Sequence, residues 1–396
     1  MGTVFPWSED YPWINFSFDF TPLHYKTWMA LGECGSICTH IENIPLAPEE
    51  RREMHKVYLA KGVLATTAIE GNTLSEEEVH KAVEGNLRVP ESKDYLKQEV
   101  ENIIGAFNEI GRQIHDNSLP EITPGLLCLY NKKVLAGLPL LEEVKPGEFR
   151  GHRVGVGSYR CPPAGYVPEM VGKLCEQLKA FDDAQLDPVV RAVLKAVIAH
   201  LYVAWIHPFG DGNGRTARLL EAMILMQCGV PSPAAHLLSN HYNITRTEYY
   251  RVLDKAGKTN DPWAFVSYAT LGLKDGLREQ RTRLMANVWK VVWKNHIYRT
   301  FDQKRRTARR DRQRQLALAL AKEERPARLQ DIKTLNTDIV MLYGNKRSMA
   351  TLRRDIHDLL KDNLIKMEVI DGQHFFTTNI QSLRFMLPLK VKDNSG

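Results

Sequence analysis

Helix-length stretches of mixed apolar and polar residues make up most of the chain, and stops containing glycine, proline or asparagine separate them. Pro48 opens the first clear helix, since proline favours the first helical position, and Glu70-Gly71-Asn72 ends it. Ser75 precedes three glutamates, which predicts the cap and acidic first turn of another helix. Residues 1–45 are aromatic-rich and are expected to be irregular. Further helices are expected at about 94–115, 123–135, 167–182, 187–206, 214–228, 245–256 and 261–283.

One stretch, FRGHRVGVGSYRCPPAG at 149–165, breaks the helical rhythm. It contains a short alternation around Val154 and Val156, several glycines and a Pro-Pro stop. This pattern predicts a small β-hairpin or flap at 152–158.

The pattern changes again after about residue 283. A long basic helix is expected at about 284–322, followed by ERPARLQDIKTLN, SMATLRRDIHDLLKDNLI and KMEVIDGQHFF. Helix, turn, helix and an Asp-Gly hairpin in that order predict a winged helix. We therefore expect a mainly α protein with a helical region at 1–115, a core at 116–283, and a basic linker helix with the winged helix at 284–396.

The composition bounds the class of protein. A chain of 396 residues with 43% hydrophobic content is long enough for a sizeable core and for two or three domains. The most apolar helix, at 189–206, contains Arg191, Lys195 and His200, which indicates a core helix and not a membrane span. Six scattered cysteines without paired metal spacing indicate free thiols in a reducing compartment. No signal peptide follows Met1, so we expect a cytoplasmic protein without membrane contact.

The densest chemistry lies in the loop IHPFGDGNGRTAR, at 206–218. Gly212 and Gly214 permit positive φ and close approach of the backbone, and the loop leads into a helix whose N–H groups can bind an anion. Arg215 and Arg218 are three residues apart and share a helical face, so both can reach one ligand. This argues for a polyphosphate site, and the absence of a following GKS or GKT excludes a Walker loop.

Two upstream residues add reaction chemistry to this loop. Asp211 supplies an oxygen ligand suited to Mg²⁺, and His207 can accept a proton near neutral pH. Together these groups suit phosphoryl or nucleotidyl transfer to a substrate hydroxyl. Taken singly, His207 is more simply a helix C-cap and Asp211 a turn residue, while Phe209 is a core anchor for the loop. The functional interpretation therefore rests on their coincidence.

HPFGDGNGRTAR matches the Fic family signature HxFx(D/E)GNGRxxR at every fixed position. The resemblance extends over about 120–265, through Pro146–Arg150, the hairpin at 152–158, Pro162-Pro163, and Arg246 with Tyr249-Tyr250. Fic proteins mostly transfer AMP from ATP to a hydroxyl side chain of a protein and release pyrophosphate. The resemblance thus implies a Fic-type helical core with a β-hairpin flap, a nucleotide substrate and a protein target.

The resemblance also implies roles for individual residues. His207 would deprotonate a Ser, Thr or Tyr hydroxyl, and Asp211 would hold Mg²⁺ on the α- and β-phosphates. Arg215 would neutralise charge developing towards pyrophosphate. The remaining phosphate-binding residues would be Gly212, Asn213, Gly214 and Arg218. The flap residues Val154, Gly155 and Val156 would hold the target segment by main-chain pairing.

A second family motif, (S/T)xxxE(G/N), matches Thr66–Gly71 and precedes the core. In the corresponding Fic class this helix is inhibitory. Glu70 would pair with Arg218 and take the space of the γ-phosphate, so that ATP is excluded or misaligned. Considered alone, Glu70 is a solvated acid at a helix end.

Some features leave the resemblance incomplete. Thr245-Arg246 replaces the Asn-Arg of many relatives, which puts the adenine-side contacts in doubt. A Fic enzyme that uses another nucleotide or removes AMP, and a DNA-binding regulator with a nucleotide-sensing core, are alternatives. The resemblance also leaves a homodimer open.

The net charge bears on the DNA alternative. The formal charge of +6 is matched by one segment, RTFDQKRRTARRDRQR at 299–314, with eight Lys/Arg and two Asp. Arg353 and Arg354 face outward if the leucines and the isoleucine of TLRRDIHDLL pack inward, which would favour nucleic acid. Three aspartates on the same helix weaken a phosphate-binding face: Asp355, Asp358 and Asp362. Winged helices also dock proteins, so DNA is the less favoured partner.

Overall fold

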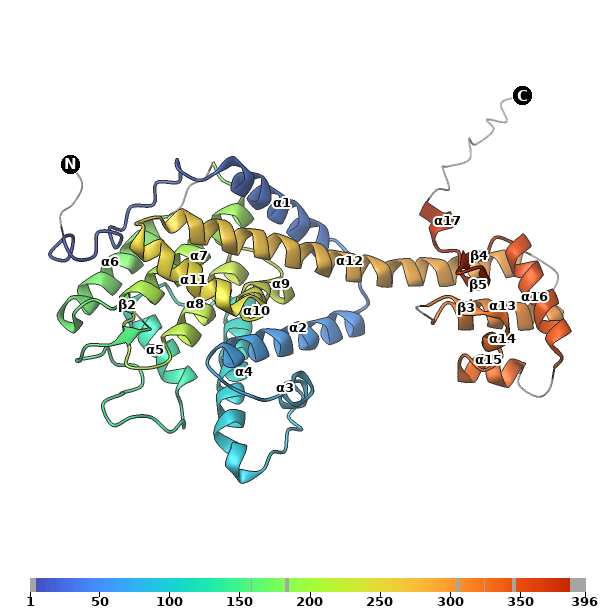
Figure 1. Ribbon diagram of the computed structural model, residues 1–396, viewed down its shortest axis with the longest axis horizontal. Helices are drawn as coiled ribbons and strands as arrows, with labels where there is room; N and C mark the ends of the chain where they lie inside the picture. The colour runs from blue at the N-terminus through green and yellow to red at the C-terminus, as the bar shows by residue number, and fades with distance from the viewer. Residues whose placement is uncertain are drawn as a thin grey trace. The chain divides into compact units, whose positions relative to one another are not determined.

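The structure is a computed structural model that describes residues 5–157, 159–181, 185–303, 307–323, 325–343 and 347–384. The chain forms two compact units, residues 1–282 and 283–396. Both are mainly helical, and the described residues contain one two-stranded and one three-stranded sheet (Figure 1). The expected boundary at 283/284 lies one residue from the division between the units, and the expected boundary at 115/116 lies inside the first unit.

Two helices joined by the chemically dense loop form the centre of the first unit, α7 (Pro188–Ile206) and α8 (Asn213–Gln227). Pro188 occupies the first turn of α7, and the Asp187 side chain accepts hydrogen bonds from the N–H groups of Val189 and Val190. In length and hydropathy α7 resembles a membrane span, but 83% of its apolar window is buried inside the fold. It is therefore the core helix that the charged residues within it predict.

Helices on all sides of α7 and α8 complete this unit. Against α7 pack α1 (Tyr25–Glu42), α6 (Val167–Ala180) and α11 (Arg246–Lys258). Against α8 pack α2 (Pro48–Ile69), α4 (Asp94–His115), α5 (Pro124–Val134) and α9 (Ser232–Ala235). The unit also contains α3 (Glu76–Val83), capped by Ser75 as expected, and α10 (Leu237–Ile244).

Helix α1 corrects the expectation that residues 1–45 are irregular. Leu31, Cys34, Ile37 and Cys38 recur at helical spacing, and all four are buried. The aromatic residues that suggested an irregular segment lie mostly before this helix. The six cysteines, all within the described residues, form no disulfide.

The flap hairpin lies slightly later in the chain than expected. Its strands are β1 (Gly155–Val156) and β2 (Tyr159–Arg160), which pair in antiparallel register. Val154 precedes β1 and extends the pairing, since its carbonyl accepts a hydrogen bond from the Cys161 N–H. Gly157, which follows β1 with a positive φ, ends that strand two residues after its start.

The expected long basic helix at 284–322 is divided into two. Helix α12 runs without a stop over Pro262–Asp302, and α13 begins separately at Ala308 and ends at Leu320. The sequence contains no glycine or proline near residue 283 that would end the earlier helix there. Thr307 caps α13 through a hydrogen bond from the Arg310 N–H, which explains the new start.

The rest of the second unit contains short helices and a three-stranded sheet. The helices are α14 (Leu329–Ile332), α15 (Thr337–Leu342), α16 (Met349–Lys361) and α17 (Gln381–Arg384). The strands β3 (Ala327–Arg328), β4 (Ile365–Ile370) and β5 (Gln373–Thr378) follow the order β3-β5-β4. Asp371 and Gly372, both with positive φ, turn the expected hairpin between β4 and β5. The hairpin is present, and the winged-helix assignment stays a prediction.

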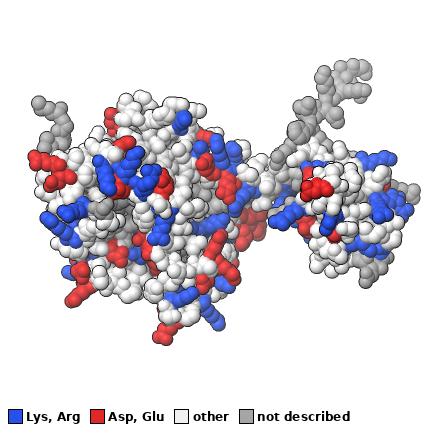
Figure 2. Space-filling model, in the orientation of Figure 1, with Lys and Arg blue, Asp and Glu red and all other residues white. Residues whose placement is uncertain are grey.

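Arginines of α13 form ion pairs with acids of α16 and with its C-cap residue, Asp362. Arg312 Nε lies 2.7 Å from the carboxylate of Asp355, and Arg310 Nη1 lies 2.9 Å from that of Asp362. Arg309 pairs with Asp358. Over the face shown in Figure 2, basic and acidic side chains are interspersed on each unit. Much of the basic segment is therefore neutralised within the fold.

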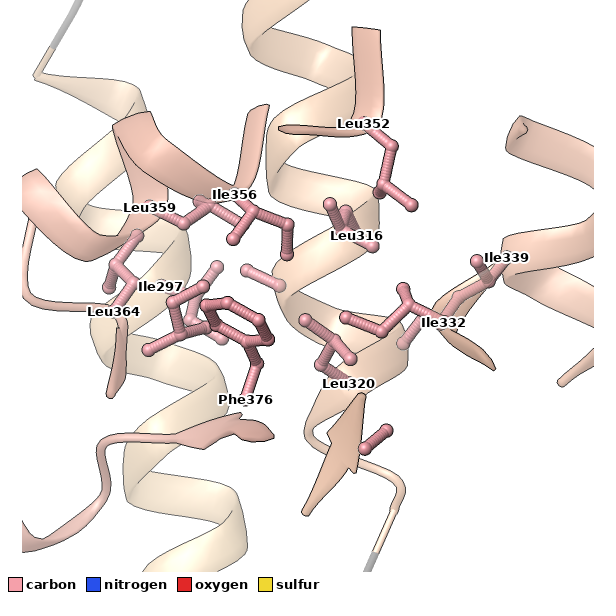
Figure 3. Close-up of a cluster of buried hydrophobic side chains, with 14 of the residues drawn as sticks. Ile297, Leu316, Leu320, Ile332, Ile339, Leu352, Ile356, Leu359, Leu364 and Phe376 are labelled. Atoms are coloured by element: carbon pink, nitrogen blue, oxygen red, sulfur yellow. The ribbon is translucent and has the colours of Figure 1, made fainter. Parts of the chain in front are cut away.

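A compact apolar core holds the second unit together. Ile297 of α12, Leu316 and Leu320 of α13, and Ile356 of α16 meet around Phe376 of β5 (Figure 3). These side chains are buried, and their spacing on each helix places them on one face. The outward face of α16 carries Arg353 and Arg354, which are exposed.

Candidate active site

Two left-handed backbone positions shape the loop between α7 and α8. His207, the C-cap residue after α7, has φ 49°, and Gly212, the N-cap residue before α8, has φ 75°. Asn213 closes the turn, because its side chain accepts a hydrogen bond from the Phe209 N–H and donates one to the Phe209 carbonyl. The Asn213 side chain is thus engaged inside the loop, and the N–H groups at the start of α8 remain to bind an anion.

A buried asparagine outside the loop supports its backbone. Asn131 of α5 donates to the Asp211 carbonyl at 2.9 Å and accepts from the Gly147 N–H at 3.0 Å. A side chain at Gly212 would approach Asn131 to 3.0 Å, so both the positive φ and the close packing favour glycine there. Phe209 is buried and packs against Phe149, which anchors the loop on its other side.

His207 is held as a neutral imidazole. Burial lowers the pKa of its ring to about 4, and a hydrogen bond with the Ala204 backbone opposes this shift. A neutral imidazole that donates one N–H to a carbonyl keeps its other nitrogen as a proton acceptor. The residue therefore has the form that a general base requires.

The loop forms one wall of a cavity of about 510 Å³, a volume in the usual range of small-molecule sites. The flap supplies the 41% exposed Val156 to another wall, and α11 supplies Tyr249 and Tyr250. The lining residues are Glu70, Val156, Gly157, Tyr159, His200, Ala204, Trp205, His207, Asn213, Gly214, Arg218, Tyr249, Tyr250, Leu253 and Asp254.

Glu70 reaches into this cavity from the end of α2. Its Oε1 lies 2.6 Å from Nη2 of Arg218, whose side chain is 1% exposed. Burial pushes the pKa of Glu70 upward. The charge and hydrogen bond of Arg218, together with the charge of Arg215 and the effect of His207, outweigh burial, so the pKa lies below its ordinary value. Gly214 leaves room for the carboxylate, because a Cβ there would collide with Glu70 Oε1. A charged carboxylate therefore sits at the N-terminus of α8.

The last turn of α2 is held through its main-chain carbonyls. Arg218 Nη2 donates to the Thr66 carbonyl at 3.0 Å, and Arg246 Nη1 donates to that of Ala68 at 3.2 Å. The Tyr250 hydroxyl donates to the Ile69 carbonyl at 3.4 Å. These donors add to the hydrogen bonds of the carbonyls at the C-terminus of α2, of which that of Ala68 also accepts from the Gly71 N–H at 3.0 Å. Thr66 contributes its carbonyl, since its buried hydroxyl has no hydrogen-bond partner among the described residues.

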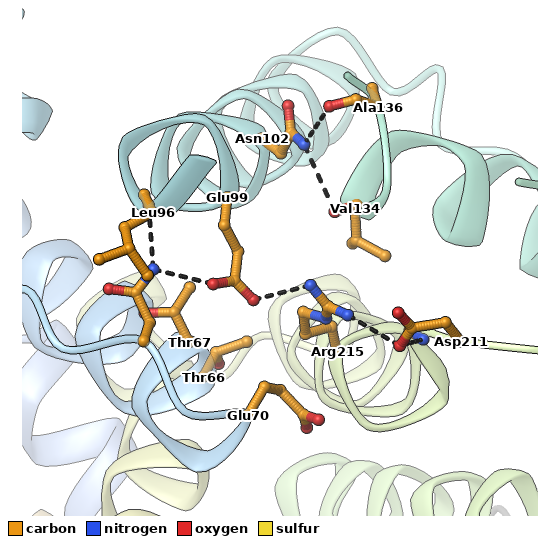
Figure 4. Close-up of polar contacts among 12 residues, drawn as sticks. Thr66, Thr67, Glu70, Leu96, Glu99, Asn102, Val134, Ala136, Asp211 and Arg215 are labelled. Carbon is orange, nitrogen blue, oxygen red and sulfur yellow. Dashed lines mark hydrogen bonds and ion pairs between the residues drawn. The ribbon is translucent and has the colours of Figure 1, made fainter. Parts of the chain in front are cut away.

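Arg215 is held by two carboxylates (Figure 4). Its Nη1 lies 2.7 Å from Oε1 of Glu99 on α4, and its Nη2 lies 3.0 Å from Oδ1 of Asp211. Asn72, just beyond α2, donates to the other oxygen of Glu99 at 2.8 Å. Burial raises the pKa of Glu99 even though Arg215 opposes the shift. Polar contacts thus connect the end of α2 with Arg215 and Asp211.

Asp211 is the candidate ligand for Mg²⁺. Its Oδ1 accepts hydrogen bonds from Arg215 and from the Gly212 N–H, and its side chain is 46% exposed. The described residues contain no cluster of three or more His, Cys, Asp or Glu that could hold a metal. One accessible carboxylate at an anion-binding helix N-terminus fits Mg²⁺ that is bound partly through substrate phosphates.

The sequence analysis gave no site role to Glu99, Asn72 or Asn131, although Asn131 holds the loop backbone and Glu99, bound by Asn72, holds Arg215. The sequence offers one indication that Glu99 has a special role, because this acid lies on the apolar face of α4 near Leu96. An acid among core positions needs a partner, but the pattern does not name Arg215 as that partner.

Comparisons with known proteins agree with this geometry. Residues 113–225 match the Fic/DOC family. Protein adenylyltransferase fic-1 of Caenorhabditis briggsae and that of Caenorhabditis elegans are each 31% identical over 218 residues, 55% of this chain and 40% of the relative. The chain therefore spans two fifths of the length of these relatives.

Solved structures resemble the fold. A Fic family protein from Desulfovibrio desulfuricans superposes with a TM-score of 0.55 at 22% identity, over 91% of this chain and 97% of that one. Fic-1 from Caenorhabditis elegans superposes with a TM-score of 0.54 at 26% identity, over 67% and 74%. With the signature loop in place, residues 113–225 form a Fic/DOC domain, and the chain is related to the Fic-1 protein adenylyltransferases.

Proposed function

We propose that this protein is a protein adenylyltransferase held inactive by Glu70. The observation that carries the proposal is the Glu70–Arg218 pair inside a cavity that also contains His207 and the start of α8. The relatives named as adenylyltransferases support the AMP chemistry, and the contact between α2 and the loop supports the inhibition.

The reaction transfers AMP to a hydroxyl side chain of a target protein. The hydroxyl oxygen forms a bond to the α-phosphorus of ATP as its proton passes to the free ring nitrogen of His207. The bond between the α-phosphorus and the oxygen bridging to the β-phosphorus breaks, and pyrophosphate leaves. The hydroxyl comes from a segment aligned along the flap at Gly155 and Val156.

The start of α8 and its two arginines suit the phosphates of ATP. N–H groups at Asn213 and Gly214 bind oxygens, and Arg215 and Arg218 balance the charge. Gly212, whose own N–H donates to Asp211, lets the backbone approach the phosphates closely. Asp211 holds Mg²⁺, which when bound supplies charge neutralisation at the phosphates.

Inhibition follows from the position of the Glu70 carboxylate. It occupies an anion site that ATP needs and engages Arg218, so phosphate groups are repelled or displaced. Its lowered pKa keeps Glu70 charged at neutral pH. Misplacing the α-phosphate relative to the hydroxyl suppresses transfer even where ATP binds.

The test compares the wild type with Glu70→Gly, incubated with Mg²⁺ and α-labelled ATP. Intact-mass analysis then reads added AMP on the protein itself and on lysate partners. Removing the carboxylate is expected to raise transfer by about tenfold or more, each tenfold being about 1.4 kcal/mol. Glu84→Gly is the matched control, because Glu84 is the exposed C-cap of α3 and lies outside the site.

No adduct from either protein would contradict AMP transfer. Repeating the incubation with other nucleotides and with AMP-modified protein then tests the two enzymatic alternatives. Nucleotide binding without any turnover would favour the sensor. An adduct of equal yield in wild type and Glu70→Gly would retain the enzyme and reject inhibition by Glu70.

A further inference from the structure

Arg150 stands out because its buried guanidinium contacts main-chain carbonyls. It is 5% exposed. Its Nε donates to the His207 carbonyl at 2.7 Å, and its Nη1 donates to that of His152 at 2.9 Å. Its Nη2 donates to the carbonyls of Pro162 at 2.6 Å and Ile206 at 3.3 Å. Within the described residues no carboxylate forms an ion pair with it.

These carbonyls come from two parts of the candidate active site. His152 and Pro162 flank the flap hairpin, one on each side. Ile206 is the last residue of α7, and His207 follows it. One planar side chain thus ties both ends of the flap to the backbone that carries the candidate base.

The backbone at His207 needs such support. Its left-handed φ of 49° is uncommon for a residue with a side chain, and such positions persist where the surroundings hold them. Arg150 holds this backbone at two carbonyls. Its side chain donates to the carbonyl of His207, and its own N–H donates to that of Pro208 at 3.0 Å.

Burying this charge is unfavourable, and burial lowers the pKa of Arg150. A lysine has one ammonium group and cannot present the rigid planar fork that reaches these separate carbonyls. Arginine is therefore required here because its guanidinium binds several carbonyls at once, and not because it neutralises an acid.

We propose that Arg150 is a positioning residue that sets the placement of His207 relative to the flap, and thereby of the base relative to the target hydroxyl. The proposal rests on the proposed function for its kinetic consequence. In-line transfer depends steeply on this placement, and an error of about 1 Å can reduce a rate about 100-fold.

The kinetic test uses the Glu70→Gly protein and adds Arg150→Lys or Arg150→Met. The kcat for AMP transfer is expected to fall about 100-fold in Arg150→Met and less in Arg150→Lys. The Kd for ATP with Mg²⁺ is expected to stay within about twofold, because the hydrogen bonds of Arg150 to the described residues go to the flap ends and to residues 206–208, before the start of α8. Arg52→Lys, an exposed change on α2, is the matched control.

Hydrogen–deuterium exchange gives a readout that does not need turnover. In the Arg150 variants, amides at 152–162 and at 203–209 are expected to exchange faster together, while those of α8 stay protected. If Glu70→Gly itself transfers no AMP, the proposed function fails while this exchange test still decides the coupling.

Three results would overturn the role of Arg150. The first is an unchanged kcat in Arg150→Met, and the second is faster exchange confined to one of the two segments. The third is loss of ATP binding or of the folded state in both variants, which would make the residue a support of the whole fold.

Discussion

At His207, burial decides which form of the imidazole meets the cavity. Removing the ring from water disfavours its charged form and lowers its pKa to about 4, while Glu70 and Asp211 raise it and Arg150 lowers it. The ring is therefore neutral, and able to accept a proton, across the physiological range.

This predicts the pH dependence of transfer by Glu70→Gly. A base titrating near pH 4 stays active as pH falls through the ordinary histidine value, and removing Glu70 takes away a charge that raises the pKa. Single-turnover rates are therefore expected to hold from about pH 8 to about pH 5.5. ATP binding over the same range is the control. An acid limb centred on the ordinary histidine pKa of 6.5 would contradict the prediction.

Removal of the base gives a second prediction at this scale. His207→Ala in the Glu70→Gly background should abolish AMP transfer, because the other described histidine that lines the cavity, His200, is fully buried within α7 and is hydrogen-bonded to the Tyr249 hydroxyl. The affinity for ATP should stay nearly unchanged. Calorimetry and intact-mass analysis on one preparation measure both quantities. Retained transfer would remove His207 from the base role.

Among the elements, α2 contacts the active-site helices α8 and α11 through hydrogen bonds to its last turn. Arg218, Arg246 and Tyr250 all donate to carbonyls there, and only the first of them also pairs with Glu70. The exposed Arg246 therefore offers a way to weaken docking without touching the carboxylate.

Arg246→Ala is expected to activate the otherwise wild-type protein weakly. Loss of a single hydrogen bond worth about 0.5–1.5 kcal/mol corresponds to an increase in transfer of about two- to tenfold. In the Glu70→Gly background the same change should add nothing if it acts through α2. A rise in both backgrounds, or a fall in either, would mean that Arg246 acts on the nucleotide instead.

The elements also show why sequence patterns predicted only part of the site. The residues from His207 to Arg218 are neighbours in the chain, so their coincidence is visible in one motif. Glu99 is 116 residues from Arg215, and Arg150 is 57 residues from His207. Periodicity places such residues on a helix or beside a hairpin, but only packing brings their partners to them. Helix α1 was not expected because aromatic residues dominate the segment before it. Helix α12 extends past the expected end at 283 because no glycine or proline ends it there.

For the whole molecule, the two units carry different chemistry. The first holds the cavity with its loop, and the second holds a core with arginines of α13 facing aspartates of α16. An arginine already paired within the fold contributes less to counterion release on DNA than a free one does.

The full chain is therefore expected not to bind duplex DNA at about 150 mM salt, where electrostatic contacts are already screened. Electrophoretic mobility across a salt series measures this directly. A complex that persists at that concentration and weakens steeply at higher salt would contradict the expectation. It would also revive the regulator among the alternatives.

The carboxylate of Glu70 can be treated as a tethered ligand that competes with the nucleotide for Arg218. Its effective concentration is set by how firmly α2 is docked, and it does not change with the amount of protein. The apparent association constant for ATP is then the intrinsic association constant multiplied by the fraction of molecules in which this tethered ligand is released. The ratio of ATP affinities between Glu70→Gly and wild type measures that fraction. A partner that binds the released α2 increases the fraction.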